Sequence, residues 1–145
     1  MKTALFAGSF DPFTLGHKSI VDRALRLFDR IIIGVGVNPN KPGWIEPDER
    51  VKRIQKIYCG DSRIEVIRFD GLTVDAARMH GAEFLLRGVR SVADFEYERQ
   101  LADINRNLSG IESVLIYATP EYASISSSVV RELANHGVDI TPYIP

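Results

Sequence analysis

The sequence predicts a doubly wound α/β fold, in which a parallel sheet carries helices on both faces. Short apolar runs alternate along the chain with longer segments whose apolar residues recur at helical spacing. Most of these runs are nearly continuous in apolar residues, which is typical of strands covered on both sides. Strict alternation of strands and helices favours parallel pairing through right-handed crossovers. We therefore expect a five-stranded, Rossmann-like sheet in a single domain that spans residues 1–145.

The elements follow from local patterns. The predicted strands are residues 3–7, 30–37, 63–69, 83–86 and 113–118. The predicted helices are residues 18–28, 47–58, 73–80, 91–108 and 127–136. Pro47 suits a helix start, and Ser91 with Asp94 forms a predicted capping box. Glycines at positions 81, 110 and 137 predict helix ends, because glycine adopts the left-handed conformation that commonly follows a helix.

Composition excludes several classes of partner. The 145 residues carry 18 Lys+Arg and 19 Asp+Glu, a net charge of −1, so no basic field favours nucleic acid or an anionic membrane. No apolar run approaches the roughly 18 residues that a membrane span needs, and the N-terminus has no signal-peptide pattern. We expect a cytoplasmic protein. Cys59 is the only cysteine, and its position in an amphipathic segment predicts core packing rather than nucleophilic catalysis.

The turn at residues 8–17 is the most informative segment. It joins the first predicted strand to the first helix and places His17 at the helix start. Gly8 and Gly16 allow another molecule close to the backbone, and the free amides of a helix N-terminus attract anions. One interpretation is a phosphate-binding turn with the imidazole directed at the phosphate. The alternative is that His17 only caps the helix or packs in the core.

Further polar side chains follow the other strands. Parallel strands end at one edge of a sheet, where open α/β folds bind ligands. Besides Ser9 and His17, the candidates at this edge are Lys41, Thr73, Arg87, Arg90, Ser126, Ser127 and Ser128. Together they favour a polyphosphate site. Taken singly, Lys41 could be a solvated loop residue, the serines could be helix caps, and the two arginines could pair with Asp94, Glu96 and Glu98.

Other phosphate and catalytic motifs do not fit. Gly34 and Gly36 begin like a dinucleotide fingerprint, but they lie inside the second predicted strand and Pro39 occupies the third glycine position. The chain contains no P-loop and no G-x-S-x-G elbow. Its three histidines lack metal-ligand spacing, so we predict no protein-built metal site.

Two motifs carry a resemblance to a known family. Residues 14–17, T-L-G-H, and residues 125–131, I-S-S-S-V-V-R, are similar to the two signature motifs of a nucleotidyltransferase superfamily. The G-S-F-D-P turn, Thr14 in the first motif and the R-G-V-R-S-V-A-D-F-E-Y-E run at residues 87–98 resemble bacterial phosphopantetheine adenylyltransferases more specifically. The resemblance covers essentially the whole chain. It implies adenylyl transfer from ATP to 4'-phosphopantetheine, giving dephospho-coenzyme A and pyrophosphate, the penultimate step of coenzyme A synthesis.

The resemblance also implies roles for individual residues. His17 would contact the α-phosphate and stabilise the transition state, while Ser9 and the Phe10 amide would hold both phosphates; Ser9 stands where many relatives have threonine. Lys41 and Arg87 would grip the acceptor phosphate, and Thr73 would contact pantetheine. The implied ATP contacts are Ser9, Phe10, His17, Gly88, Val89, Arg90, Glu98, Tyr122, Ala123, Ser124, Ile125, Ser126, Ser127 and Ser128. The implied catalytic set is His17, Ser9, Lys41 and Arg90.

The resemblance further implies Mg²⁺ bound through the ATP phosphates and assembly into a homohexamer. Two rival functions remain at this point. One is a sister nucleotidyltransferase acting on nicotinamide mononucleotide or glycerol phosphate, against which Thr14 and the D-F-E-Y-E run argue. The other is a noncatalytic nucleotide-binding module, which would not need His17.

Overall fold

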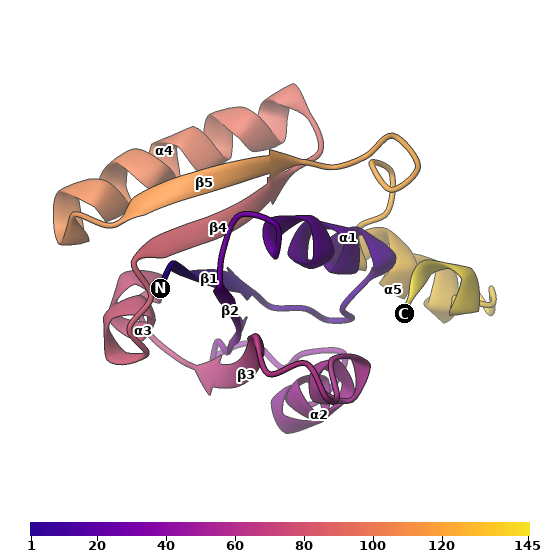
Figure 1. Cartoon of the computed structure of the whole chain (residues 1–145). Coiled ribbons are helices and arrows are strands. Elements are labelled where there is room, and N and C mark those ends of the chain that lie inside the picture. Colours follow the sequence, from indigo (N-terminus) through magenta and orange to yellow (C-terminus); the bar gives the residue numbers. More distant parts are fainter.

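The computed structural model describes all 145 residues and contains one five-stranded parallel sheet with the strand order β3-β2-β1-β4-β5 (Figure 1). The strands are β1 Thr3–Gly8, β2 Arg30–Gly36, β3 Ile64–Phe69, β4 Phe84–Val89 and β5 Glu112–Tyr117. The helices are α1 Leu15–Ala24, α2 Pro47–Ile57, α3 Thr73–Met79, α4 Val92–Ser109 and α5 Ser127–Asn135, followed by the 3-10 helix η1 Thr141–Tyr143. The predicted parallel α/β sheet is confirmed.

Alternate residues of the central strand β1 face two separate cores. Ala4 and Phe6 pack in a cluster with buried residues of α1 and α2, whereas Leu5 and Ala7 pack in a second cluster with α3. The two-residue period of a strand sends successive side chains to opposite faces, so a strand covered on both sides must be apolar throughout. Helix α4 contacts β4, β5 and α3. Both faces of the sheet are therefore covered, as a doubly wound fold requires (Figure 1).

The strand order reverses at β1. Its neighbours are β2 on one side and β4 on the other, so the crossovers after β1 and after β4 run in opposite directions. The loops that leave the carboxyl ends of β1 and β4 diverge there and leave space between them. Figure 1 shows α5 beyond this edge of the sheet, close to the start of α1.

Three predicted boundaries are wrong by three residues or more. Strand β4 continues to Val89, three residues past the prediction, because Gly88 and Val89 pair with Ile116 and Tyr117 of β5. Arginine and glycine in sequence suggest a loop, and only pairing with a neighbour makes them strand. Helix α1 begins at Leu15 rather than at residue 18 and ends at Ala24. His17 therefore lies inside the first turn of α1.

The helix ends largely follow prediction. Gly110 caps α4 with φ 74°, and Gly81 and Gly137 also have positive φ after α3 and α5. Ser91 accepts a hydrogen bond from the Asp94 amide, but the Asp94 carboxylate accepts from the Arg90 amide at 3.1 Å instead of completing the predicted capping box. None of the helices combines the length and hydropathy needed to cross a membrane.

Candidate active site at the strand-order reversal

A hollow of about 330 Å³ lies between the carboxyl ends of β1 and β4 and the start of α5. It brings together residues from segments far apart in the sequence. The predicted site residues that line it are Ser9, Phe10, His17, Arg87, Gly88, Val89, Arg90, Glu98, Tyr122, Ile125, Ser126, Ser127 and Ser128. The fold therefore brings together in one place most of the residues that the resemblance assigns to ATP.

A second hollow of about 280 Å³ adjoins the first on the β2 and β3 side. Thr73 lines it together with Gly8, Val37 and Asn38. Ala7, Gly8 and Arg87 line both hollows, so the two adjoin at the carboxyl end of β1. Four predicted site residues do not line the larger hollow: Lys41, Thr73, Ala123 and Ser124. Lys41 is exposed in the loop after β2, where its amide bonds to Asn38 O at 3.1 Å, and lines neither hollow.

His17 is held by its own helix. The Thr14 hydroxyl accepts a hydrogen bond from the His17 amide at 3.3 Å, and the Thr14 amide donates to His17 Nδ1 at 3.0 Å. This reciprocal cap places the imidazole beside the hollow and assigns Nδ1 as an acceptor. In a neutral ring the proton is then on Nε2, so the imidazole has one free N–H to donate. The capping role foreseen for His17 is confirmed, and it is compatible with a role in the hollow.

The surroundings of His17 keep it neutral. Its ring lies 5.0 Å from that of Phe10 and 5.3 Å from that of Phe13, measured between centroids. Burial, followed by the positive charges of Arg90 and Arg87, lowers the pKa of His17 from 6.5 to about 4. At neutral pH the imidazole is therefore a neutral hydrogen-bond donor beside two guanidinium groups.

The two arginines pair with acidic residues of α4. Arg87 donates from Nε and Nη2 to the two carboxylate oxygens of Glu98 at 2.9 and 2.7 Å, and its Nη1 donates to Ala7 O. Glu98 is only 6% exposed. Arg90 lies 3.5 Å from Asp94 in a more exposed pair. The ion-pair alternative is confirmed for both arginines, although Arg87 and Glu98 form a half-buried bidentate pair rather than a surface one.

The serine-rich segment is mainly structural in its contacts. Ser126 caps α5 by accepting from the Val129 amide at 3.1 Å, which confirms the capping alternative for this residue. The Ser127 hydroxyl donates to Pro12 O at 2.7 Å, and so joins the start of α5 to the turn after β1. Ser128 accepts from Arg131 at 3.3 Å. Ser126, Ser127 and Ser128 at the start of α5 nevertheless line the hollow, and a helix N-terminus favours anions.

Comparison with known proteins gives the family. The model of the cytidylyltransferase-like family matches residues 5–133. The phosphopantetheine adenylyltransferase of Phocaeicola vulgatus is 50% identical over 145 residues, which are 100% of this chain and 96% of that protein. The enzyme of the same name from Porphyromonas gingivalis is 49% identical over 98% of this chain and 93% of that protein. That from Flavobacterium johnsoniae is 42% identical over 100% of this chain and 95% of that protein.

The chain belongs to the phosphopantetheine adenylyltransferase family.

A solved structure shares the fold of this family member. It is the bifunctional NMN adenylyltransferase/ADP ribose pyrophosphatase of Francisella tularensis, complexed with AMP and a manganese ion. The TM-score is 0.74 at 13% identity, and the match covers 99% of this chain and 44% of that protein. At this identity the likeness concerns the fold alone.

Sequence reasoning missed three residues that shape this adenylyltransferase-family site. Asp11 and Arg50 are 7% and 5% exposed, and Arg131 donates from Nη1 to Asp11 O at 2.6 Å. Arg131 ends the I-S-S-S-V-V-R motif, so a signal was present. Arg50 lies at the helical spacing of Ile54 and Ile57, and a charged residue on an apolar face indicates a buried partner.

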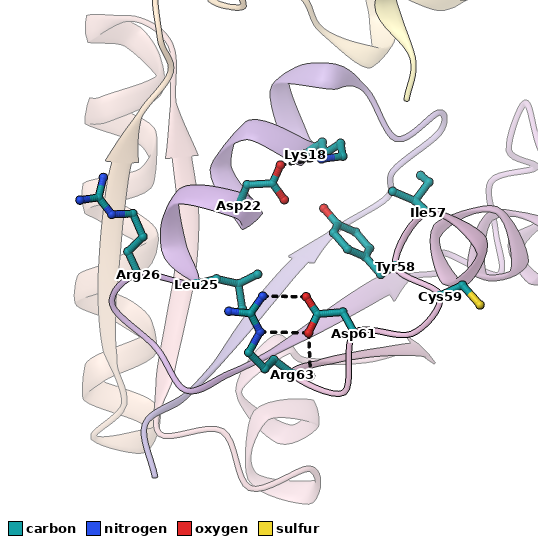
Figure 2. Close-up of a pocket in the computed structure, with 9 residues that line it drawn as sticks. All are labelled: Lys18, Asp22, Leu25, Arg26, Ile57, Tyr58, Cys59, Asp61 and Arg63. Atoms are coloured by element: carbon teal, nitrogen blue, oxygen red, sulfur yellow. Dashed lines mark hydrogen bonds and ion pairs between the residues drawn. The ribbon is translucent and has the colours of Figure 1, made fainter.

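Another hollow of about 380 Å³ lies between α1 and the segment after α2. Four of its five charged side chains form two pairs, Lys18 with Asp22 at 2.6 Å and Arg63 with Asp61 at 2.8 Å, as Figure 2 shows. None of the predicted site residues lines this hollow. Cys59 lies here, and the prediction that it packs in the core is wrong. Helix α2 ends at Ile57, which leaves Cys59 exposed in the following turn.

Proposed function

We propose that the protein transfers the adenylyl group of ATP to 4'-phosphopantetheine, giving dephospho-coenzyme A and pyrophosphate, the penultimate step of coenzyme A biosynthesis. Membership in the family supports this reaction. The observation that carries it in the structure is the neutral His17, whose free N–H lies beside Arg87 and Arg90 at the edge of a hollow. A donor surrounded by cations suits negative charge that develops on a phosphate.

The proposed reaction is a direct in-line displacement. An oxygen of the acceptor phosphate bonds to the α-phosphorus of ATP while the bond to pyrophosphate breaks and pyrophosphate takes the electron pair. The acceptor oxygen is already ionised at neutral pH, so the step needs no general base. No covalent enzyme intermediate forms. Positioning and charge stabilisation can supply the rate acceleration.

We assign His17 the role of transition-state donor. Its Nδ1 accepts from the Thr14 amide, which leaves no free lone pair with which it could act as a base. Its Nε2–H can bond an oxygen of the α-phosphate as charge accumulates there. Because the bond to Thr14 fixes the ring before substrate binds, little reorganisation is needed during the reaction.

We propose that the two hollows divide the substrates. The larger one takes ATP through Phe10, His17, Gly88, Val89, Arg90 and the segment from Tyr122 to Ser128, including Ala123 and Ser124 at its margin. The smaller one takes the pantetheine side through Thr73, with Lys41 reaching the acceptor phosphate from the loop above. Ser9 and Arg87 lie at the junction, where the acceptor and α-phosphates meet. Glu98 lines the ATP hollow and holds Arg87 at the junction.

Mg²⁺ would reach this site on the triphosphate of ATP. The carboxylates that line the larger hollow, Asp94 and Glu98, are paired with Arg90 and Arg87, and no group of three or more His, Cys, Asp or Glu side chains is arranged to hold a metal ion. The residues present therefore do not fit a protein-built magnesium site. Phosphate oxygens and water are the ligands that Mg²⁺ usually retains in such enzymes.

We also propose a homohexamer. Apolar side chains of α4 are exposed, including Val92 at 81%, Tyr97 at 60% and Leu108 at 56%, and the edge strand β5 exposes Tyr117 at 71%. Such side chains suit burial between copies of the chain. Light scattering should then give about 97 kDa, six times the 16.2 kDa chain, and a mass of a monomer would contradict the proposal.

The deciding experiment is pyrophosphate release from ATP with three separate acceptors: 4'-phosphopantetheine, nicotinamide mononucleotide and glycerol phosphate. We expect turnover with the first at least about a hundredfold faster than with the others, because the acceptor must fill the smaller hollow to place its phosphate. No release with phosphopantetheine would overturn the proposal. Binding of ATP without turnover of any acceptor would favour a nucleotide-binding module instead.

A further inference from the structure

A buried ion pair joins the turn after β1 to the start of α2. Asp11 Oδ1 lies 3.7 Å from Arg50 Nε, and the two side chains are 10% and 5% exposed. Neither residue has a role in the proposed chemistry. Removing two charges from water is costly, so a buried pair is weak evidence for stability and can instead serve to fix one arrangement of the chain.

The carboxylate of Asp11 holds the loop that follows β2. The Trp44 amide donates to Oδ2 and the Ile45 amide donates to Oδ1, each at 2.8 Å. The two backbone amides satisfy both oxygens, and the nearby guanidinium supplies the opposite charge that a buried carboxylate requires. The last part of the loop that carries Lys41 is thereby fixed to the turn that carries Ser9.

Arg50 completes the connection from the other side. Its Nη1 donates to Ser9 O at 2.9 Å, and its Nε donates to Ile45 O at 2.8 Å. One planar guanidinium thus bonds the backbone of both loops. Such a fork fixes the position of two backbone segments more closely than a flexible lysine ammonium could.

The pair is packed so closely that only glycine fits beside it. A Cβ placed on Gly43 would lie 2.3 Å from Arg50 Nη2 and 3.0 Å from Asp11 Oδ2. Gly43 follows Lys41 by two residues, so their Cα atoms are at most about 7 Å apart. The flexible side chain of Lys41 is therefore tethered close to the Ser9 turn, although Lys41 itself lies in an exposed part of the loop.

We propose that Asp11 and Arg50 are positioning residues for the acceptor side of the site. Their buried pair holds the loop at residues 38–46 against the Ser9 turn, so that Lys41 can reach the phosphate of the acceptor. The role of Lys41 rests on the proposed function; the attachment of the loop does not. None of the residues 38–46 lines the larger hollow that takes ATP, so release of this loop should affect the acceptor side first.

Trp44 reports the attachment without any substrate, because it is the only tryptophan of the chain. Asp11→Asn replaces one carboxylate oxygen by a donor that cannot accept from the loop amide, and Gly43→Ala forces the guanidinium aside without changing any charge. We expect acrylamide to quench Trp44 fluorescence at least about twofold more efficiently in both variants. Unchanged quenching in both would overturn the attachment, whatever the enzyme acts on.

Kinetics then test whether the attachment serves Lys41. We expect Asp11→Asn and Gly43→Ala to raise KM for phosphopantetheine at least about tenfold, because the charge-assisted hydrogen bond from Lys41 to its phosphate is weakened. KM for ATP should stay within about twofold of the wild type. Lys41→Met should raise the same KM without altering Trp44 quenching. Combined with Lys41→Met, Asp11→Asn should add little further increase, because both changes remove one interaction.

A control variant tests whether a loss of stability alone raises KM for phosphopantetheine or Trp44 quenching. Ile111→Ala is the control. Ile111 is 8% exposed, belongs to the core cluster that contains no residue of the Ser9 turn, and precedes β5 at the opposite end of the strands. It should lower the midpoint of urea unfolding and leave both KM values and Trp44 quenching unchanged. Equal rises of the two KM values in Asp11→Asn, or fully multiplicative effects with Lys41→Met, would overturn the positioning role. Absence of wild-type turnover would refute the proposed function and leave the quenching result to decide the attachment.

Discussion

Replacing His17 by alanine separates substrate binding from catalysis. The imidazole offers one donor, Nε2–H, because Nδ1 is already bonded to the Thr14 amide at 3.0 Å. Removal of a single preorganised donor to developing charge typically costs about 2.7–4 kcal/mol, or about 10²–10³ in kcat. We therefore expect His17→Ala to bind ATP within about threefold of the wild type and to lose at least about 99% of kcat.

The same substitution also weakens the fold, and a second variant distinguishes the two effects. Thr14 is 1% exposed, so alanine at position 17 leaves a buried amide without a partner, at a cost of about 1–3 kcal/mol. His17→Asn can place its Oδ1 near the position of Nδ1 and so retain the cap, but it has no atom where Nε2 was. We expect His17→Asn to recover much of the stability and none of the activity.

The assay combines initial rates of pyrophosphate release with calorimetric titration of ATP and urea unfolding. His80→Ala is the matched control, since His80 lies after α3, 3.8 Å from Glu65 and outside both hollows. It should keep kcat within about twofold of the wild type. A folded His17→Asn or His17→Ala variant with kcat within about threefold of the wild type would refute the assignment of His17 as the transition-state donor.

Three further predictions concern pH and stability. The pKa of His17 falls from 6.5 in the unfolded chain to about 4 in the folded protein, so between these pH values the unfolded chain binds more protons. The unfolding free energy measured in urea should therefore rise by about 1–3 kcal/mol from pH 4 to pH 6.5. An equal rise in His17→Ala would exclude His17 as its origin. Glu98→Gln weakens the bidentate partner of Arg87 and should lower the unfolding free energy by about 1–3 kcal/mol. The control Glu96→Gln, at an exposed position, should change it by less than about 0.5 kcal/mol. Equal losses in the two variants would contradict the buried pair. Gly110 has φ 74°, so Gly110→Ala should lower the unfolding free energy by about 1 kcal/mol in thermal denaturation and leave kcat unchanged. A stabilised variant would contradict the left-handed cap.

The fold was predictable because its signals are local and repeated. Continuous apolar runs such as residues 31–33 indicate strands buried on both faces, and glycines such as Gly110 mark helix ends through backbone conformation alone. The end of β4 was not predictable in this way. Gly88 becomes strand only because it pairs with Ile116, a partner 28 residues further along the chain.

The candidate site shows the same division. The residue types and spacing around His17, Arg87 and the serine-rich segment predicted a phosphate site at one edge of the sheet, and the hollow confirms that most of these residues meet. The sequence left open whether His17 caps a helix or faces a ligand. The structure shows that Thr14 holds one ring nitrogen, which determines the proton position and leaves the other nitrogen free.

The sequence by itself determined the order of elements, their parallel arrangement and the residue types of the turn at positions 8–17, because these follow from patterns within a few residues. Only the tertiary structure decided which charges pair and which face the hollows. The sequence offered Glu98 only as one of three possible partners for the two arginines, and it did not show that Asp11 meets Arg50 across 39 positions. The pKa of His17 likewise depends on burial and on cations brought in from β4, which exist only once the chain has folded.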